Sequence, residues 1–362
     1  MLKNLPLSSE YKRKMKIFNE GRAYYHNKQI KGAVYFPSRA YNAYQTWMYF
    51  DRTVIARDFG YAKSAGLNAL RIFTSYEYWQ EEAELFWKKF ESLLSVAEEQ
   101  DILVMPILFE NCGREPSREN MLDQDPETAA CIQSPGRKIT ENRKLWGKPA
   151  EYTREFMKRY ADDERLAAIE LMNEPHEETG DIPFAQFITK TAFDMKKRVP
   201  LSIGCISLQH NLYFAQWIEV YQFHDNFPSD RENFEKKLRD AVSLQEMTGK
   251  AVWLSEWQRL RISGPGWDQR VIPEEDKIPY LSSLAEAVYQ SGIGSFFWSL
   301  MVKPAYLPAQ RINGTINGLF HEDGRVYSTA DYIAVSGKQN SPEAFTQPPL
   351  WYVEELKRTG KE

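Results

Sequence analysis

Apolar segments of strand length alternate with longer amphipathic segments along most of the chain, and this alternation restricts the possible folds more than any other feature. The apolar segments predict eight β-strands, at 30–36, 68–73, 102–109, 166–172, 201–205, 219–223, 251–255 and 294–298. Helical periodicity predicts a short helix after the fifth strand and longer helices at 52–65, 82–100, 149–162, 184–198, 231–248, 274–290 and 329–335. Alternating strands and helices form parallel sheets, and eight such units specify a (β/α)8 barrel (TIM barrel) better than an open sheet.

The 362 residues are interpreted as one domain, because α/β barrels commonly use roughly 200–250 residues or more as a single unit. Residues 1–29 are predicted to be a polar N-terminal extension and 30–340 the barrel. Residues 341–362 are predicted to be a C-terminal tail or a helix packed on the barrel. A long irregular segment, 110–148, follows the third strand. Because such loops in compact domains usually serve a function, we expect a lid over the barrel mouth.

Composition excludes several classes of partner. The chain carries 46 Lys+Arg against 50 Asp+Glu, a net charge of −4, which argues against nucleic acid or an anionic membrane. Its three cysteines are too few and too scattered for a disulfide framework or a thiolate zinc site. No signal peptide or membrane-spanning segment is recognisable, so we expect a soluble cytoplasmic protein. No HxxxH or His-x-His pair occurs, so we expect neither a metal nor another cofactor.

Two predicted strands finish at a glutamate. Ile-Glu-Leu-Met-Asn-Glu-Pro contains Glu174 just before its final proline, and Ala-Val-Trp-Leu-Ser-Glu-Trp presents Glu256. Pro175 cannot donate to a sheet ladder, so it should mark the end of the first of these strands. Barrel enzymes keep their chemistry at this face of the sheet. We therefore expect both carboxyl groups at the barrel mouth.

A pair of carboxyl groups suits the cleavage of a glycosidic bond. One group supplies a proton to the leaving oxygen and the other supplies electron density to the sugar carbon, and in retaining enzymes they lie about 5–5.5 Å apart. Their environments must differ so that one holds a proton while the other is ionised. We expect Arg71 to keep Glu256 anionic, and we expect the charge of a neighbouring carboxylate to raise the pKa of Glu174.

The same residues resemble the retaining glycoside hydrolases of clan A, with glycoside hydrolase family 5 (the cellulase and mannanase superfamily) as the nearest type. The resemblance covers about residues 31–324. It implies that Glu174 is the acid/base and Glu256 the nucleophile. It further implies that Asn173 binds a sugar hydroxyl, that Arg71 supports the nucleophile, and that His224 and Trp298 belong to the sugar site.

The chain departs from this family pattern in two places. The family usually has His-x-Tyr after the sixth strand, whereas here the sequence is His224-Asp225-Asn226, so the tyrosine support is missing or replaced. After the third strand the family often has His-Asn, whereas here Glu110 and Asn111 follow. Glu110 is expected either to pair with Arg71 or Arg114, or to accept hydrogen bonds from substrate hydroxyls.

We therefore expect an enzyme, a glycosidase, that cleaves β-glycosidic bonds of short oligosaccharides by double displacement. Trp257, with Arg71, Glu110, Asn111, Asn173, His224 and Trp298, completes the predicted substrate-binding set. Two alternatives remain open, namely a non-hydrolytic sugar-binding barrel and a metal-dependent barrel hydrolase. The sequence leaves the sugar, the linkage and the oligomeric state undetermined.

Overall fold

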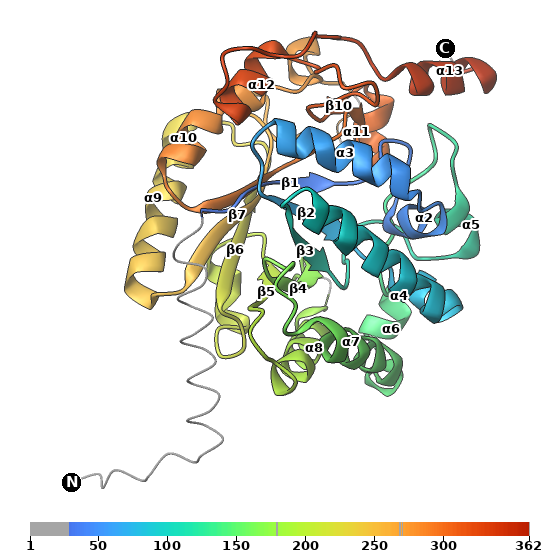
Figure 1. The fold of residues 1–362 in the computed structure, drawn as a ribbon, viewed down its shortest axis with the longest axis vertical. Helices are drawn as coiled ribbons and strands as arrows, with labels where there is room; N and C mark the ends of the chain where they lie inside the picture. Colours follow the sequence, from blue (N-terminus) through green and yellow to red (C-terminus); the bar gives the residue numbers. More distant parts are fainter. Residues whose placement is uncertain (1–28, 179, 268, 270, 362) are drawn as a thin grey trace, which may run out of the picture.

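Eight parallel strands form a closed barrel in which β8 pairs with β1 (Figure 1). The computed structural model describes residues 29–361 except 179, 268 and 270, so nearly all of the predicted N-terminal extension lies outside the described part. The barrel confirms the predicted fold class. Its strands are β1 Lys31–Tyr35, β2 Ala69–Phe73, β3 Leu103–Ile107, β4 Ile169–Asn173, β5 Leu201–Gly204, β6 Val220–Asp225, β7 Ala251–Trp257 and β8 Gly294–Phe297.

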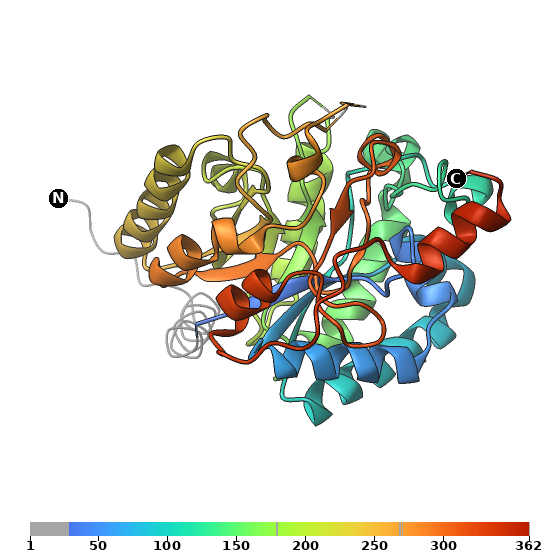
Figure 2. The same cartoon turned by 90° about the horizontal axis from the view of Figure 1, so that it is seen from above.

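Helices surround the strands, as the two perpendicular views show (Figures 1 and 2). The α-helices are α2 Ala43–Met48, α3 Arg52–Ser64, α4 Tyr76–Glu99, α5 Arg118–Leu122, α6 Arg137–Thr140, α7 Gly147–Tyr160, α8 Ile182–Asp194, α9 Arg231–Thr248, α10 Ala285–Gln290, α11 Pro308–Ile312, α12 Thr329–Ser336 and α13 Leu350–Arg358. Shorter elements are the 3-10 helices η1 Arg143–Leu145, η2 Gln209–Tyr213, η3 Glu274–Asp276 and η4 Leu281–Ser283, and the strand pair β9 Lys303–Pro304 and β10 Ile316–Asn317. No described helix combines the length and the apolar character required to cross a membrane.

Local signals explain where the long helices begin and end. The side chain of Asp51 accepts hydrogen bonds from the first turn of α3, and Asp230 does the same for α9. Gly249 ends α9 in the left-handed conformation, with φ +61°. The structure reproduces the predicted bounds of α9, whose two ends are set by the local residues Asp230 and Gly249.

The helix predicted at 274–290 is wrong. This segment contains η3, an irregular stretch, η4 and only then the short helix α10. Pro279 lies in the middle of the segment, and a proline disfavours the helical conformation of the residue before it. Helix α4 also differs from its prediction, since it begins at Tyr76 and has a non-helical residue at Glu82, where the predicted helix began.

The segment 110–148 has an ordered conformation that includes α5, α6 and η1. At its start, Glu110 and Ser134 exchange backbone hydrogen bonds of 2.7 and 2.8 Å. Farther along, the buried guanidinium of Arg311 donates to the carbonyl oxygens of Pro126 and Ala129. Lys361, just after α13, pairs with Asp125 at 2.6 Å. Segments distant in sequence therefore hold the predicted lid in place.

The barrel interior is apolar at one end and polar toward the carboxyl ends of its strands. Ile30, Val220 and Phe296 belong to the apolar interior cluster. Farther along, the interior holds the fully buried Arg71 and Glu170, which form an ion pair. Side chains of one strand alternate between the interior and the surrounding helices, so a charged residue within a buried strand can still face the barrel axis.

Gly204, at the end of β5, is predicted to be required by this polar layer. A Cβ atom there would lie 2.3 Å from Oε1 of Glu170 and 2.9 Å from Nη2 of Arg71. Because both side chains are buried, Gly204→Ala should lower the free energy of unfolding by about 1–3 kcal/mol, measured by urea denaturation. Gly60→Ala within α3 is the control, since its Cβ meets no atom within 4 Å and a helical alanine should add up to about 1 kcal/mol. Equal stability of the two variants would contradict the tight packing.

Candidate functional site

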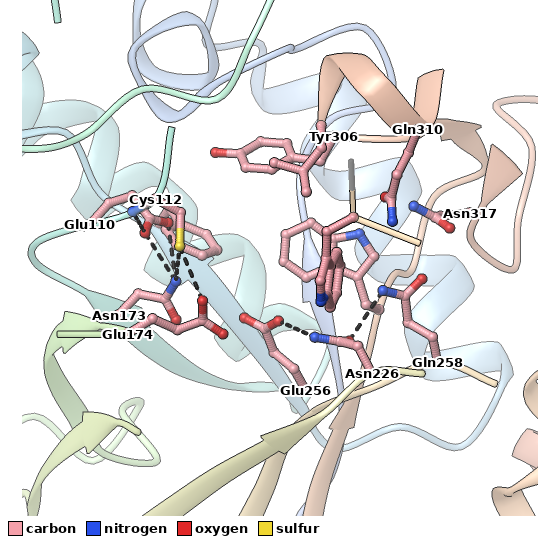
Figure 3. A pocket seen from close by; sticks show the side chains of 14 residues that line it. Glu110, Cys112, Asn173, Glu174, Asn226, Glu256, Gln258, Tyr306, Gln310 and Asn317 are labelled. Carbon is pink, nitrogen blue, oxygen red and sulfur yellow. Dashed lines mark hydrogen bonds between the residues drawn. The ribbon is translucent and has the colours of Figure 1, made fainter. Parts of the chain in front are cut away.

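A cavity of about 270 Å³ opens at the carboxyl ends of the strands (Figure 3). This is the face of a parallel barrel where ligands bind. Side chains from the strand ends form one part of its wall, and side chains from the segments after β7 and β8 form the other. The lining residues are Phe73, Glu110, Cys112, Asn173, Glu174, Asn226, Glu256, Gln258, Trp267, Trp298, Tyr306, Leu307, Gln310 and Asn317.

Both strand-end glutamates reach this cavity. Glu174 directly follows β4 and adopts the left-handed conformation with φ +47°, which is unusual for a residue with a side chain. Glu256 lies within β7. A carboxylate oxygen of Glu174 and one of Glu256 lie within 4.8 Å of each other. This separation fits the short spacing of retaining glycosidases and is well below the roughly 6.5–9.5 Å of inverting ones.

Arg71 connects Glu256 with the barrel interior. Its Nη1 donates to Oε1 of Glu256 at 2.6 Å, while Nε and Nη2 form a two-pronged pair with Glu170 at 2.8 and 2.5 Å. Burial opposes the positive charge, but the two glutamates outweigh it and raise the pKa of Arg71. The expected contact of Arg71 with Glu256 is present. Arg71 itself is fully buried and is not part of the cavity wall.

Glu170, the second carboxylate that pairs with Arg71, was not predicted from the sequence. It lies between Ile169 and Leu171 in a run interpreted only as a buried strand. The signal was available, because a carboxylate within such a strand requires a buried cation, and Arg71 in β2 is one.

Asn226 resolves the first departure from the family pattern. Its Nδ2 donates to Oε2 of Glu256 at 2.9 Å, and its own Oδ1 accepts from Gln258 at 3.2 Å. The oxygen of Glu256 that Arg71 leaves free is therefore bound by an amide. The support expected from a tyrosine is replaced by Asn226, two residues after His224.

Glu174 has a different set of partners. Its Oε1 lies 2.5 Å from Nδ1 of His224, and its Oε2 accepts from Sγ of Cys112 at 3.1 Å. Burial disfavours the charged carboxylate, but the hydrogen bond and charge of His224, with contributions from Cys112 and Arg71, lower the pKa of Glu174. The expectation of a raised pKa is therefore wrong. It counted the neighbouring carboxylate and overlooked a cation in direct contact.

The pKa of His224 shifts in the opposite direction. Burial disfavours the imidazolium, but the charge of Glu256, the hydrogen bond that His224 makes to Glu174 and the charge of Glu174 raise the pKa of His224 above its ordinary 6.5. The two glutamates thus have unlike neighbours, an arginine with an amide for Glu256 and an imidazole with a thiol for Glu174. Such a pair can hold a proton beside one carboxylate while the other remains a free nucleophile.

The other predicted site residues separate into two groups. Asn173, Glu110 and Trp298 line the cavity. Asn111 instead donates from Nδ2 to the backbone oxygen of Glu174 at 2.8 Å and so supports the loop after β4.

Trp257, predicted as a substrate-binding residue, lies outside the cavity wall. The side chain is fully buried and packs edge-on against Tyr289 and Phe297. Neighbouring residues of a strand face opposite sides, so Trp257 faces the helices because Glu256 faces the barrel axis.

Several cavity residues had no signal in the sequence. Tyr306, Leu307, Gln310 and Asn317 come from the segment between β8 and α12, and Trp267 from the segment after β7. These stretches have no periodicity from which a position near the barrel axis could be predicted.

Two groups of described side chains have the spacing of metal ligands. One consists of Glu174, His224 and Glu256, whose contacts are already explained by proton sharing and by Arg71. The other, His176, Glu177 and His210, is partly exposed and does not line the cavity. Tyr213 donates to Glu177 at 2.6 Å in that group.

Comparison with solved structures supports the barrel, while no family model and no curated protein matches the sequence. An exo-β-1,4-mannosidase from Opitutaceae bacterium strain TAV5 superposes with a TM-score of 0.59 and 17% identity, over 91% of this chain and 60% of that one. A GH5_18 protein from Streptomyces cattleya in complex with Manβ1-4GlcNAc gives 0.57 and 16%, over 88% and 83%. A Glycoside Hydrolase Family 5 mannosidase from Rhizomucor miehei gives 0.53 and 13%, over 92% and 94%. The fold is shared with this family. At these identities the likeness concerns the fold alone.

The pairing of His224 with Glu174 predicts a titration. Glu174→Gln should lower the pKa of His224, because it removes a charge and a charge-assisted hydrogen bond from a buried imidazole. Histidine ring NMR would follow this. Glu177→Gln, whose carboxylate lies 3.5 Å from His210, is the matched control and should leave His224 unchanged. An unshifted His224 in Glu174→Gln would contradict the pairing.

The same pairing predicts a pH window of stability. The lowered pKa of Glu174 contributes stability above about 4.5 that is lost as pH falls through its folded pKa. The raised pKa of His224 contributes stability below about 6.5 that is lost as pH rises through its folded pKa.

Proposed function

We propose that the protein is a retaining glycoside hydrolase acting on β-glycosidic bonds, with Glu256 as nucleophile and Glu174 as acid/base. The observation that carries this proposal is the approach of the two carboxylates to within 4.8 Å in a cavity at the barrel mouth, each with a different charge partner. Double displacement requires that spacing and that difference.

The first step would break the bond between the anomeric carbon and the leaving oxygen. Glu256 attacks the carbon and forms a glycosyl ester, while a proton passes to the leaving oxygen from Glu174. In the resting pair this proton lies on His224, which can return it to Glu174 across their 2.5 Å contact. In the second step Glu174 takes a proton from water, and the hydroxide oxygen displaces Glu256 from the sugar.

The small volume of the cavity supports exo action on short substrates. A volume of about 270 Å³ is slightly below the roughly 300–1,000 Å³ of pockets for drug-sized ligands, which suits one sugar ring. Tyr306, Gln310 and Asn317 form a wall opposite Glu174, so a long polymer has little room to continue past it (Figure 3). The names of the structural neighbours make β-1,4-linked mannosides the first substrates to test.

The free cysteines support the further proposal of a cytoplasmic location. Cys112, Cys131 and Cys205 are all unpaired thiols, as suits a reducing compartment. Cell fractionation would test this, and recovery from the medium would overturn it.

The two alternatives have less support. A sugar-binding barrel without turnover has no need for an arginine and an amide on both oxygens of Glu256. A metal-dependent hydrolase requires metal ligands in the cavity. The group of His176, Glu177 and His210 does not line it, and Glu256 and Glu174 of the other group are already paired with Arg71 and His224.

We predict that single sugars are released from one chain end. The test follows reducing-end-labelled β-1,4-manno-oligosaccharides and a panel of other β-linked oligosaccharides and nitrophenyl glycosides over time. The blocked end of the cavity should give products shortened by one sugar at a time. Internal fragments at early times would contradict exo action, and binding without any turnover would instead support the sugar-binding barrel.

We also predict that Glu174→Ala affects poor leaving groups most. Loss of the proton donor should lower kcat/KM about 10²–10⁴-fold for oligosaccharides and much less for activated aryl glycosides. Azide should restore turnover of the aryl glycosides and yield a β-glycosyl azide. Glu177→Ala, an exposed glutamate of the same loop, is the control. Equal losses for both classes of leaving group, without azide rescue, would remove Glu174 from the acid/base role.

A further inference from the structure

Glu110 is a buried carboxyl group in the cavity wall that no cation neutralises among the described residues. Its exposed fraction is 2%. The two ion-pair partners considered from the sequence are engaged elsewhere. Arg71 pairs with Glu170 and Glu256, and Arg114 donates to the backbone oxygen of Thr128. A buried charge without a cation is costly, so Glu110 requires another means of being stabilised.

The hydrogen bonds of Glu110 leave one oxygen with spare capacity. Oε1 accepts from the backbone N–H of Cys112 at 2.6 Å and from Nδ2 of Asn173 at 3.0 Å. Oε2 has only the longer contact of 3.3 Å with the same Nδ2. A carboxyl oxygen can make about two hydrogen bonds, so Oε2 can make a further one with a molecule in the cavity.

The groups that face Glu110 oppose a negative charge on it. They are the carboxyls of Glu174 and Glu256. The thiols of Cys112 and Cys131 and the phenol of Tyr306 also face Glu110, but their pKa values are raised, so they are neutral and supply no cation. Burial is the main cause that raises the pKa of Glu110, to about 8, and the charges of Glu174 and Glu256 add to it against the hydrogen bonds from Asn173 and Cys112. At neutral pH most molecules therefore hold a proton at this position.

We propose that Glu110 acts as a neutral carboxylic acid and donates a hydrogen bond from Oε2 to a hydroxyl oxygen of the sugar bound beside Asn173. This rests on the proposed glycosidase function and adds a specificity residue to it. Asn173 is held between Glu110 on its amide nitrogen and Arg71 on its amide oxygen, at 2.6 Å. Glu110 thus offers a donor beside an amide of fixed orientation, and a sugar epimer without an oxygen at this place leaves the buried donor unpaired.

The proposal predicts that substrate affinity and stability both fall as pH rises. Above about pH 8 Glu110 loses its proton, which removes the donor and places a third negative charge beside Glu174 and Glu256. Substrate affinity should fall there. Stability should follow the same direction, because a raised folded pKa gives a contribution that is present below about 4.5 and is lost as pH rises through about 8.

The test compares Glu110→Gln with Glu110→Ala on the best substrate of the glycoside panel. At pH 6.5 glutamine keeps a donor and should lower kcat/KM by about threefold, whereas alanine should lower it by at least about tenfold. The alkaline limb near pH 8, seen as a rise in KM, should be present in the wild type and absent in Glu110→Gln. Glu119→Gln removes an exposed carboxylate of the same lid and is the matched control.

A second measurement needs no substrate. Carbon NMR of side-chain carboxyls in the full chain, assigned with Glu110→Gln, should show Glu110 titrating near pH 8. Titration near its ordinary 4.5 would overturn the inference and leave the proposed function intact. Equal losses for glutamine and alanine, or a rise of KM near pH 8 that persists in Glu110→Gln, would also overturn it. Absence of turnover on every glycoside, with the titration near pH 8 observed, would instead reject the proposed function.

Discussion

The site depends on the ion pairs and hydrogen bonds of one buried guanidinium, that of Arg71. Its charge is compensated by two contacts with Glu170 and one with Glu256, and Asn173 accepts a further hydrogen bond. These partners belong to β4 and β7, so the arginine of β2 connects three strands at the barrel mouth. Removing one partner of a buried ion pair typically costs about 3–5 kcal/mol, because the remaining charge is left uncompensated. Glu256 is therefore held in position as one of the carboxylates that compensate the buried charge of Arg71.

The remaining carboxyl groups of the site are each stabilised in a different way. Glu174 is ionised beside His224, whereas Glu110 has no cation and favours its protonated form. Two cations, Arg71 and His224, are thus shared among four buried or half-buried glutamates, with Glu170 held in the interior. The contact with His224 lowers the pKa of Glu174 and raises that of the imidazole. Two carboxyl groups can therefore differ in pKa because they contact different charged or polar side chains, and neither of them needs an apolar environment.

The irregular segments decide the shape of the cavity. Tyr306 and Gln310 come from the excursion after β8, and Cys112 from the lid after β3. Arg311 ties these two segments together through backbone oxygens of the lid. The lid is further held by the ion pair of Asp125 with Lys361, beyond α13 at the end of the chain. The shape of the cavity therefore depends on contacts between parts of the sequence that are far apart.

Sequence alone determined the elements whose signals are local. Alternation of apolar runs and helical periodicity predicted the eight strands and the barrel. The predicted bounds of α9 agree with the structure, in which Asp230 and Gly249 cap its two ends. The position of Glu174 and Glu256 at strand ends followed from the same patterns. The helix predicted at 274–290 does not form over its whole length, because Pro279 interrupts the helical periodicity of this segment.

Only the tertiary structure decided which side chains meet. It turned Trp257 toward the helices, brought Asn226 to Glu256, and placed His224 and Cys112 on the two oxygens of Glu174. Proton affinity in a buried site depends on neighbours within a few ångströms, and those neighbours come from different strands and loops. A linear pattern records which residue types are present, whereas the direction of a pKa shift depends on distances that exist only after the barrel has closed.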